Sequence, residues 1–489
     1  MIQAASAIIN GKAVSGDGPE VALLNPTTEE KLTGFAEAGA DLVDQAAQAA
    51  RAAFRDGRWR NKSVEERQKV LRRIADALEA RTDELAEIET SNTGIPITQT
   101  RGRHVGRAAH NFRFFADYIG QTAGQLYDQA PEHLTFVRRQ PVGVAALIAP
   151  WNAPIALGSM KIAAAIAFGN SCVMKPSEIA PLSIQRIVEI IHEAGLPEGV
   201  VNLVNGRGAT TGDALVRHPE TNVVSFTGGT VTGRTILATA GSLLKPGVME
   251  LGGKSANIIF DSADYERALD GALLGIFTNN GQQCLAGSRI LVQKSIADRF
   301  IEEFVARAQR LKIGSPFDTS TNLGPVITAN QRDRVLGFVD IATAGGGKLL
   351  TGGRKAPGFE KGYFVEPTVV LAADPRAKVC QEEIFGPFAT ILTFETPDEA
   401  FAIANDSSFG LVSYVWTEDH YLALRAQEEL EAGVVWINTP MMRELRAPFS
   451  GWKDSGVGAQ SGRDCEAFYT NQKTVTMSRH PLNLPKLGK

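Results

Sequence analysis

Apolar strands and amphipathic helices alternate regularly through the middle of this chain, and this alternation constrains the fold more than any other feature. Between residues 142 and 226 the pattern predicts four strands separated by three helices. The predicted strands are 144–148, 171–174, 200–204 and 223–226, and the predicted helices are 155–168, 181–194 and 209–217. Repeated strand–helix–strand units build a parallel sheet covered by helices, which is the usual dinucleotide-binding architecture.

A second alternating series follows and predicts a second α/β domain. Its strands are expected near 255–260, 288–293, 388–394, 412–415 and 434–437. A chain of 489 residues is also too long for a single hydrophobic core, which independently favours two large domains. Residues 1–40 alternate short apolar runs with turns, as an opening β-segment does, and helices are expected over 40–54 and 104–121. Between these helices, Ser63 and Glu66 form a capping box that predicts another helix start.

Composition argues against several classes of function. A net charge of −4 offers no basic field for nucleic acid and no polybasic patch for a membrane surface. The four cysteines are widely spaced and the seven histidines show no paired spacing, so neither a disulfide framework nor a bound metal is expected. The most apolar region, 142–168, is interrupted by prolines, an asparagine and a lysine, and is not a membrane span. The N-terminus lacks the pattern of a signal peptide, so a cytoplasmic protein is expected.

One cysteine is distinguished by its position. Cys284 lies in a loop of small and polar residues, FTNNGQQCLAGSRI at 277–290, between a predicted helix and a predicted strand. Such a junction holds a thiol in place and leaves it open to a substrate. A cysteine thiolate is the most nucleophilic ordinary side chain, although the thiol needs activation at neutral pH. The alternative is an inert buried thiol, which is the common role of a lone cysteine.

Two segments at strand ends indicate a dinucleotide site. The run FTGGTVTGR at 226–234 follows a strand and opens a helix, so its free amides and the helix dipole can face a phosphate. At the end of an earlier strand, Lys175 and Glu178 are placed to bond ribose hydroxyls, and the carboxylate would repel the additional phosphate of NADP. The glycines at 206, 208 and 212 form a weaker pattern, which a simple turn explains equally well.

Further polar residues occupy tight turns. Asn152 follows a strand within PWNAP, where it serves either as a turn amide or as a donor to an oxyanion. Glu250 precedes a glycine pair, and is either a satisfied cap or a base whose pKa is raised by desolvation. Glu383 and Phe385, within EIFGP, place a carboxylate and an aromatic ring at a turn, and the local pattern alone describes a capped loop.

Taken together, these motifs resemble the aldehyde dehydrogenase superfamily. They occur in the order typical of that family and span nearly the whole chain: PWN at 150–152, KPSE at 175–178, the 226–234 loop, ELGG at 250–253, GQQC at 281–284, EIFGP at 383–387 and PFSG at 448–451. The resemblance implies an α/β fold with two Rossmann-type domains and a small β oligomerisation arm. The implied boundaries are an NAD-binding domain at 1–122 and 142–252, a catalytic domain at 253–454, and an arm at 123–141 and 470–489 that assembles a homodimer or homotetramer.

The resemblance also implies a role for each motif residue. Cys284 would attack the aldehyde to form a thiohemiacetal, and Asn152 would hold the oxyanion. Hydride would leave to NAD, and Glu250 would activate water against the remaining thioester to release the free acid. The residues implied to contact the cofactor, with NAD preferred over NADP, are Trp151, Lys175, Glu178, Gly228, Gly229, Gly233, Glu383 and Phe385.

Two segments depart from the family pattern. Gly229 stands where many members carry a small hydroxyl residue, so one phosphate hydrogen bond is expected from elsewhere. Residues 455–462 are SGVGAQSG, where a run similar to SGxGREGG is usual. The Arg–Glu pair of that run is missing, and with it the basis for a local ion pair or proton path.

Two arginine-containing segments indicate the class of substrate. MRELRAPF at 442–449 and the run that begins at Arg107 resemble the branch that acts on hydroxymuconic and aminomuconic semialdehydes. In that branch Arg107 and Arg443, with Phe449 beside them, would converge on a substrate carboxylate. Alternatively, the arginines of 442–449 are structural ion-pair partners, and the substrate is an aromatic or aliphatic aldehyde without a carboxylate.

A different class of function also fits the central cysteine. A cysteine hydrolase or thioesterase built on Cys284 and Glu250 would form acid without reducing NAD, and the paired cofactor segments speak against it. A non-catalytic relative would have lost motif residues, whereas this chain retains the central ones.

Overall fold

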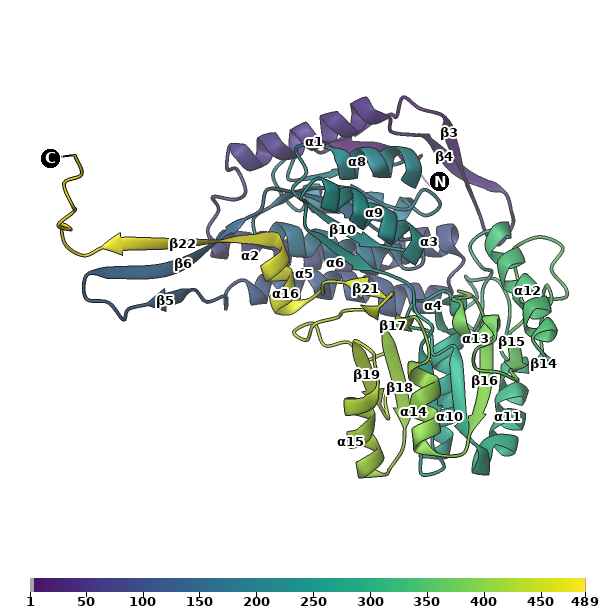
Figure 1. The fold of residues 1–489 in the computed structure, drawn as a ribbon. Coiled ribbons are helices and arrows are strands. Elements are labelled where there is room, and N and C mark those ends of the chain that lie inside the picture. Colours follow the sequence, from purple (N-terminus) through teal and green to yellow (C-terminus); the bar gives the residue numbers. More distant parts are fainter. Residues whose placement is uncertain (1–3, 489) are drawn as a thin grey trace.

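The computed structural model describes residues 4–488, which form two α/β bodies and a narrow three-stranded extension (Figure 1). The first body is built on an eight-stranded sheet with strand order β2-β1-β9-β8-β7-β10-β11-β21. Its strands are β1 (Ala7–Ile9), β2 (Lys12–Val14), β7 (Val144–Ile148), β8 (Ser171–Lys175), β9 (Val201–Leu203), β10 (Val223–Thr227), β11 (Gly247–Glu250) and β21 (Gly456–Val457). The strands β9, β8, β7, β10 and β11 run parallel to one another, whereas β1 pairs with β9, and β21 with β11, in antiparallel orientation.

Helices cover both faces of this first sheet. Along β7, Ala145 and Leu147 belong to a buried cluster shared with α5, α6 and α7, while Val144 and Ala146 belong to a second cluster shared with α1 and α8. Because successive strand residues point to opposite faces, an uninterrupted apolar strand requires cover on both sides. The helices are α1 (Ala40–Arg55), α2 (Val64–Glu79), α3 (Thr82–Thr93), α4 (Ile97–Gln99), α5 (Gly106–Tyr118), α6 (Pro154–Ala167), α7 (Leu182–Glu193), α8 (Asp213–Arg217), α9 (Thr230–Ser242) and α16 (Gly462–Tyr469).

The second body carries a seven-stranded sheet with strand order β14-β15-β16-β13-β12-β18-β19. Its strands are β12 (Ala256–Ile259), β13 (Arg289–Gln293), β14 (Lys348–Thr351), β15 (Thr368–Leu371), β16 (Phe388–Phe394), β18 (Val412–Trp416) and β19 (Val434–Ile437). Every pairing is parallel except that of β14 at one edge. Its helices are α10 (Tyr265–Phe277), α11 (Lys294–Gln309), α12 (Ala329–Ala344), α13 (Lys378–Gln381), α14 (Pro397–Asn405) and α15 (His420–Glu429).

The extension joins two segments that lie far apart in the sequence. Strand β6 (His133–Pro141) pairs along its full length with β22 (Thr470–Ser478), and β5 (Gln125–Tyr127) adds to its other edge. This three-stranded sheet projects away from both bodies at the left of Figure 1. Two small ribbons complete the fold, β3 (Glu20–Leu24) with β4 (Lys31–Ala36), and β17 (Phe409–Gly410) with β20 (Trp452–Lys453).

The structure confirms the predicted fold class of two α/β bodies and a β extension, and corrects several local predictions. The helix predicted at 104–121 is a π-helical turn at Thr100–Val105 followed by α5, which ends at Tyr118. The helix predicted at 209–217 likewise starts with a π-helical turn, Gly208–Gly212. Strands β11, β14 and β15 were not predicted, since each has only four residues and β14 is a half-exposed edge strand. The capping box of Ser63 and Glu66 is present as predicted.

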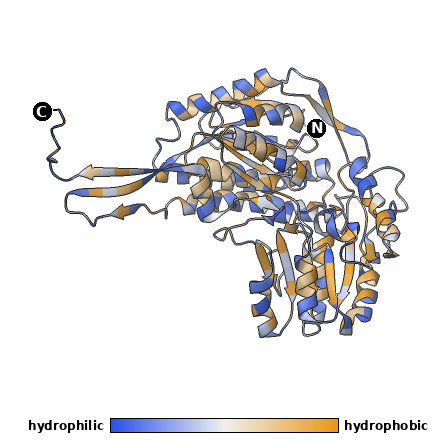
Figure 2. Ribbon diagram, viewed as in Figure 1, coloured by the Kyte–Doolittle hydropathy of each residue, from blue (hydrophilic) through white to orange (hydrophobic). Residues whose placement is uncertain are grey.

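Hydrophobic residues gather on the strands and on the inner helix faces of both bodies, whereas the outer helix faces are hydrophilic (Figure 2). No helix among residues 4–488 is both long enough and apolar enough to traverse a bilayer.

Candidate active site

The loop that carries Cys284 is fixed by an unusual backbone. After α10, Asn279, Asn280 and Gly281 all adopt left-handed conformations, with φ of 59°, 56° and 69°. The Asn280 amide donates to two backbone carbonyls outside the loop, at 3.0 and 2.9 Å. A Cβ at Gly281 would lie 2.1 Å from the carbonyl oxygen of Gly386, so only glycine allows the cysteine loop to pack against the 383–387 turn.

The Cys284 thiol is half-buried, whereas the other three cysteines are buried. Burial, followed by the charges of Glu383 and Glu250, raises the pKa of the Cys284 thiol to about 12. The resting group is therefore a thiol. A base must remove its proton before it can act as a nucleophile.

Asn152 lies directly across from this loop. Its side-chain amide donates to the carbonyl oxygen of Gln282 at 3.0 Å, and the amide of Asn279 donates to the backbone oxygen of Asn152 at 2.7 Å. The next residues begin α6, whose Ile155 amide donates to the buried Glu89 carboxylate at 3.0 Å. The Asn152 side chain therefore has a fixed orientation, and its amide retains a second hydrogen for an oxyanion.

Glu250 occupies the end of β11 and is buried. Burial raises its pKa to about 7, although the positive charges of Arg443 and Lys161 act in the opposite direction. One of its carboxylate oxygens, Oε1, has no hydrogen-bond partner within the described residues. A carboxylate with a pKa near neutrality and an available oxygen suits a general base.

Lys161 is a buried lysine close enough to Glu250 to act on its charge, and the sequence analysis did not identify it. It lies fully buried in α6, where its ammonium donates to Ser225 Oγ at 2.9 Å, and burial lowers its pKa to about 8. The signal was present, since this lysine interrupts the most apolar stretch of the sequence. Gln460 also contacts Ser225 Oγ, at 3.5 Å, so a neutral amide stands where the usual run has a carboxylate.

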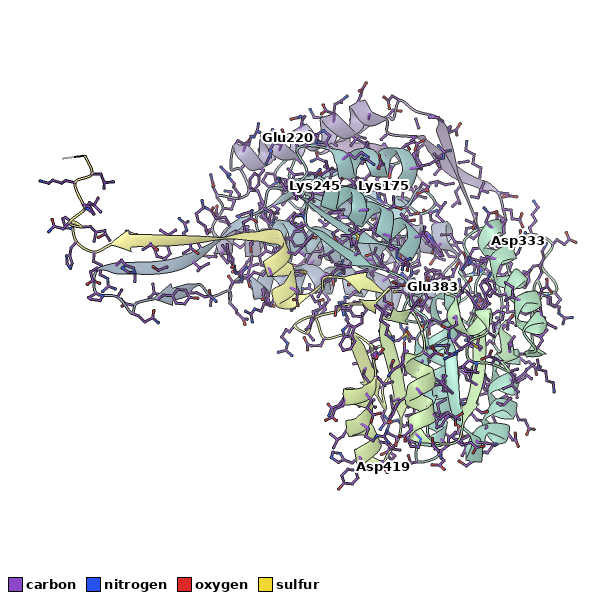
Figure 3. All side chains as sticks on the ribbon, in the orientation of Figure 1. Lys175, Glu220, Lys245, Asp333, Glu383 and Asp419 are labelled. Carbon is purple, nitrogen blue, oxygen red and sulfur yellow. The ribbon has the colours of Figure 1, made fainter. Side chains whose placement is uncertain are left out.

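A cavity of about 500 Å³ opens beside Cys284. It brings together seven of the predicted site residues, namely Trp151, Asn152, Gly228, Gly229, Cys284, Glu383 and Phe385. Glu383 marks this region in Figure 3, at the junction of the two bodies. Glu250, Gly233, Lys175 and Glu178 do not line the cavity.

The wall of the cavity contributed by 227–232 is the start of α9. Its N-cap is Gly229, which has no side chain to bond the first-turn amides, and these amides remain available for an anion. Gly233 has a packing role, because a Cβ there would lie 2.2 Å from the Leu251 side chain. The first turn of α9 therefore offers free backbone amides to an anion without a side-chain hydroxyl.

Glu383 and Phe385 lie on the opposite wall. The backbone amide of Gly253 donates to the Glu383 carboxylate at 2.9 Å, and burial raises the pKa of this carboxyl to about 7. Phe385 has a left-handed backbone with φ of 66°, and its ring meets the Trp151 ring edge to face at 5.2 Å. The two predicted cofactor aromatics thus contact each other across the cavity.

Lys175 is the last residue of β8, in the first body (Figure 3), and Glu178 lies in the loop that follows. The buried Lys175 ammonium donates to the Pro176 carbonyl at 2.9 Å and contacts Glu178 at 3.4 Å. Burial lowers the pKa of Lys175, and the carboxylates of Glu178 and Glu37 act against this effect. Glu37 is itself paired with Arg207 at 2.6 Å, so Glu178 is the carboxylate that Lys175 contacts at this end of the sheet.

Arg107 and Arg443 come close to each other although they lie far apart in the sequence. The Arg107 guanidinium donates to Asn111 at 2.9 Å, and burial together with the charge of Arg443 lowers its pKa to about 10. Arg443 lies over the Phe449 ring at 3.8 Å, and burial lowers its pKa to about 10 against the influence of Glu250. Neither arginine forms a salt bridge within residues 4–488.

No group of three or more His, Cys, Asp or Glu residues in the described part of the chain is arranged to hold a metal ion. The arrangement instead combines a thiol, an amide donor and a helix start with free amides around one cavity, and the buried Glu250 carboxylate lies outside that lining but close enough to act on the thiol. This arrangement fits an oxidoreductase. The chain matches the aldehyde dehydrogenase family over residues 13–475, and it belongs to that family.

Individual relatives and solved structures show which members of the family this chain resembles. The chain is 44% identical to the 5-carboxymethyl-2-hydroxymuconate semialdehyde dehydrogenase of Escherichia coli, over 91% of this chain and 95% of the relative. Among solved structures, PnpE from Pseudomonas sp. WBC-3 is 41% identical, with a TM-score of 0.96 and full coverage of both chains. A betaine aldehyde dehydrogenase from Staphylococcus aureus, solved in complex with NAD+, is 37% identical with a TM-score of 0.96, covering 99% of this chain and 97% of that one.

Proposed function

We propose that this enzyme oxidises a carboxylated, muconic-type semialdehyde to the free acid, with NAD as the hydride acceptor. The observation that carries the substrate class is the pair of half-buried guanidiniums, Arg107 and Arg443, neither of which forms a salt bridge with a carboxylate within residues 4–488. A partly buried charge without an ion-pair partner is costly, and a substrate carboxylate would supply the missing charge. Arg446, by contrast, forms an exposed ion pair with Glu444 at 2.8 Å.

The relatives favour the same substrate class. The Escherichia coli relative is named for a semialdehyde that carries carboxylates. The Staphylococcus aureus relative is named for betaine aldehyde, whose quaternary ammonium two unpartnered guanidiniums would repel. A neutral aromatic or aliphatic aldehyde remains the second candidate, because the Phe449 ring beside Arg443 offers an apolar surface.

The proposed cofactor fits the cavity beside Cys284. The uncapped start of α9 would receive the phosphates, and Glu383 would exchange its bond with Gly253 for the hydroxyls of the nicotinamide ribose. The rings of Trp151 and Phe385 would bound the nicotinamide. Bound NAD supplies the hydride acceptor, and the residues of this chain do the remaining chemistry.

The proposed mechanism assigns one task to each catalytic group. Cys284, once deprotonated, attacks the aldehyde carbon, and the free hydrogen of the Asn152 amide stabilises the oxyanion. Collapse of this adduct expels hydride and leaves a thioester on Cys284. Glu250 then removes a proton from the attacking water, which releases the acid and restores the thiol.

An aldehyde panel followed at the NADH absorbance tests this proposal. Succinic semialdehyde and butanal form an informative pair, because they differ chiefly in the carboxylate. Higher kcat/KM for the carboxylated partner, with stoichiometric NADH, is the expected outcome. Release of acid from an ester or thioester, with no NADH formed from any aldehyde, would favour the cysteine hydrolase. Equal kcat/KM for both aldehydes would favour a neutral substrate.

We also propose that the β5–β6–β22 extension mediates assembly of a homodimer or homotetramer. It projects away from both bodies, and large apolar side chains on it are exposed, including those of Leu126 (64% exposed) and Met477 (55% exposed). Exposed apolar surface on a projecting sheet favours contact with another chain. Light scattering of the purified protein measures the assembly.

Replacing Glu178 with serine is expected to narrow the preference for NAD over NADP by about tenfold, since this change removes a negative charge beside the ribose hydroxyls. The measurement is kcat/KM for each cofactor in wild type and variant. A matched control is Glu193→Ser, which removes a carboxylate from the exposed end of α7. If the wild-type enzyme prefers NADP, Glu178 does not lie where we place it.

Replacing Arg443 with alanine is expected to raise KM for a carboxylated semialdehyde about tenfold or more, because a hydrogen-bonded charge contact contributes roughly 1.5–3 kcal/mol. KM for a neutral aldehyde should rise far less. The kinetics with both aldehydes are best measured above about pH 8.5, where Glu250 is ionised and loss of the positive charge of Arg443 does not alter the protonation of Glu250. Arg446→Ala, at the surface ion pair, is the matched control. An equal rise in KM for both aldehydes would mean that Arg443 stabilises its loop and does not bind the substrate.

A further inference from the structure

Ser461 adopts a backbone conformation that residues with side chains rarely occupy. Its φ and ψ are 94° and 154°, a region used almost exclusively by glycine, and the residue is fully buried. It stands at the position where the usual run SGxGREGG has a glycine. A strained conformation of this kind costs roughly 1–3 kcal/mol and persists only when surrounding contacts enforce it.

The Ser461 hydroxyl does not perform the usual task of a serine at this position. Ser461 is the N-cap of α16, where a serine side chain ordinarily accepts a hydrogen bond from a first-turn amide, yet no such bond is present. The hydroxyl oxygen instead accepts a hydrogen bond from Arg443 Nη2 at 2.7 Å. The backbone amide of Ser461 donates to Cys465 Sγ at 3.1 Å, which fixes the residue from the other side.

The Arg443 guanidinium is therefore held on two sides. Ser461 Oγ bonds one nitrogen, and the Phe449 ring supports the planar face at 3.8 Å. The two supports are themselves tied together, since Phe449 and Gln460 exchange a pair of backbone hydrogen bonds of 2.8 Å. A guanidinium has five N–H donors, and the contact with Ser461 is the one hydrogen bond that Arg443 makes to side chains within residues 4–488.

We propose that Ser461 is a positioning residue for substrate selectivity: its hydroxyl orients the Arg443 guanidinium so that the remaining N–H donors face the carboxylate of the aldehyde. This inference rests on the proposed carboxylated substrate and adds the residue that prepares its binding site. A guanidinium fixed before binding loses less side-chain freedom when the carboxylate arrives. The backbone strain is retained because glycine, which would relieve it, has no hydroxyl.

A pair of variants separates the hydroxyl from the strain. Ser461→Ala removes the hydroxyl and keeps the strained backbone, whereas Ser461→Gly removes both. The readout is the ratio of kcat/KM for succinic semialdehyde to that for butanal, with thermal unfolding of each variant measured alongside. We expect this ratio to fall about tenfold in both variants, mainly through KM for the semialdehyde. Ser461→Gly should unfold at a higher temperature than Ser461→Ala. The control is Ser295→Ala, whose hydroxyl bonds Asp261 at the surface.

A double-mutant cycle decides whether Ser461 acts through Arg443. In an Arg443→Ala background, Ser461→Gly should leave the selectivity ratio unchanged, because there is no guanidinium to orient. If the losses of selectivity in the two single variants add up in the double variant, the inference is overturned. It is also overturned if Ser461→Gly keeps the wild-type selectivity ratio. If the wild-type enzyme itself does not favour succinic semialdehyde over butanal, and other carboxylated semialdehydes behave likewise, the substrate proposal fails and the inference fails with it. Wild-type selectivity that survives in both Ser461 variants overturns the inference alone.

Discussion

Replacing Cys284 with alanine is expected to lower aldehyde oxidation by about 10⁴-fold or more, since removing a catalytic nucleophile has an effect of at least this size. The reason is specific to the site, because the other three cysteines are buried and only Cys284 lines the cavity. NAD binding should persist, because the start of α9 and the Glu383 turn remain intact. Steady-state NADH formation and a separate titration of NAD binding provide the two measurements.

The matched control for this variant is Cys172→Ala, which removes a thiol buried within β8. It should retain the chemistry, although a small loss of stability is expected from the buried cavity. Substantial turnover in Cys284→Ala would remove this thiol from the mechanism. Loss of NAD binding together with activity would instead indicate that the loop has collapsed.

The second large effect is expected for Glu250→Gln. The amide has nearly the same shape but cannot take a proton from water, so hydride transfer should proceed once per site and hydrolysis of the thioester should then stall. We expect a burst of NADH followed by a steady rate lowered about 10²–10⁴-fold, the usual range for loss of a general base. Rapid-mixing absorbance measurements distinguish the two phases. A burst that falls in parallel with the steady rate would show that Glu250 acts before hydride transfer.

The pH profile gives an independent check on the same residue. Burial raises the pKa of Glu250 to about 7, so the carboxylate becomes available as a base only as the pH rises through this value. When hydrolysis limits the wild-type rate, kcat should therefore increase from about pH 6 to pH 8 and then level off, and the Gln variant should lack this rise. Glu220→Gln is a suitable control, since this carboxylate pairs with Arg51. Glu220 lies on the side of the first body that faces away from the second body (Figure 3).

The sequence by itself determined the fold class and the motif positions. Apolar runs such as 144–148 and 223–226 predicted parallel strands, because a strand buried on both faces must be apolar throughout. Short motifs predicted which residues follow strand ends, and the structure places seven of them around one cavity. Both kinds of information are local, since periodicity and turn composition act over a few neighbouring residues.

The tertiary structure alone decided how distant residues act on one another. Lys161 was visible only as a break in an apolar helix, and its proximity to Glu250 follows from the packing of α6 against the sheet. Arg107 and Arg443 were predicted to converge by resemblance, but their partial burial, and the lack of a salt bridge to either within residues 4–488, are properties of the folded chain. For Ser461 the local pattern shows only a serine where the usual run has a glycine, and the strained backbone and the bond to Arg443 appear only in the folded chain. Desolvation and charge interactions depend on distances through space, which sequence periodicity does not encode.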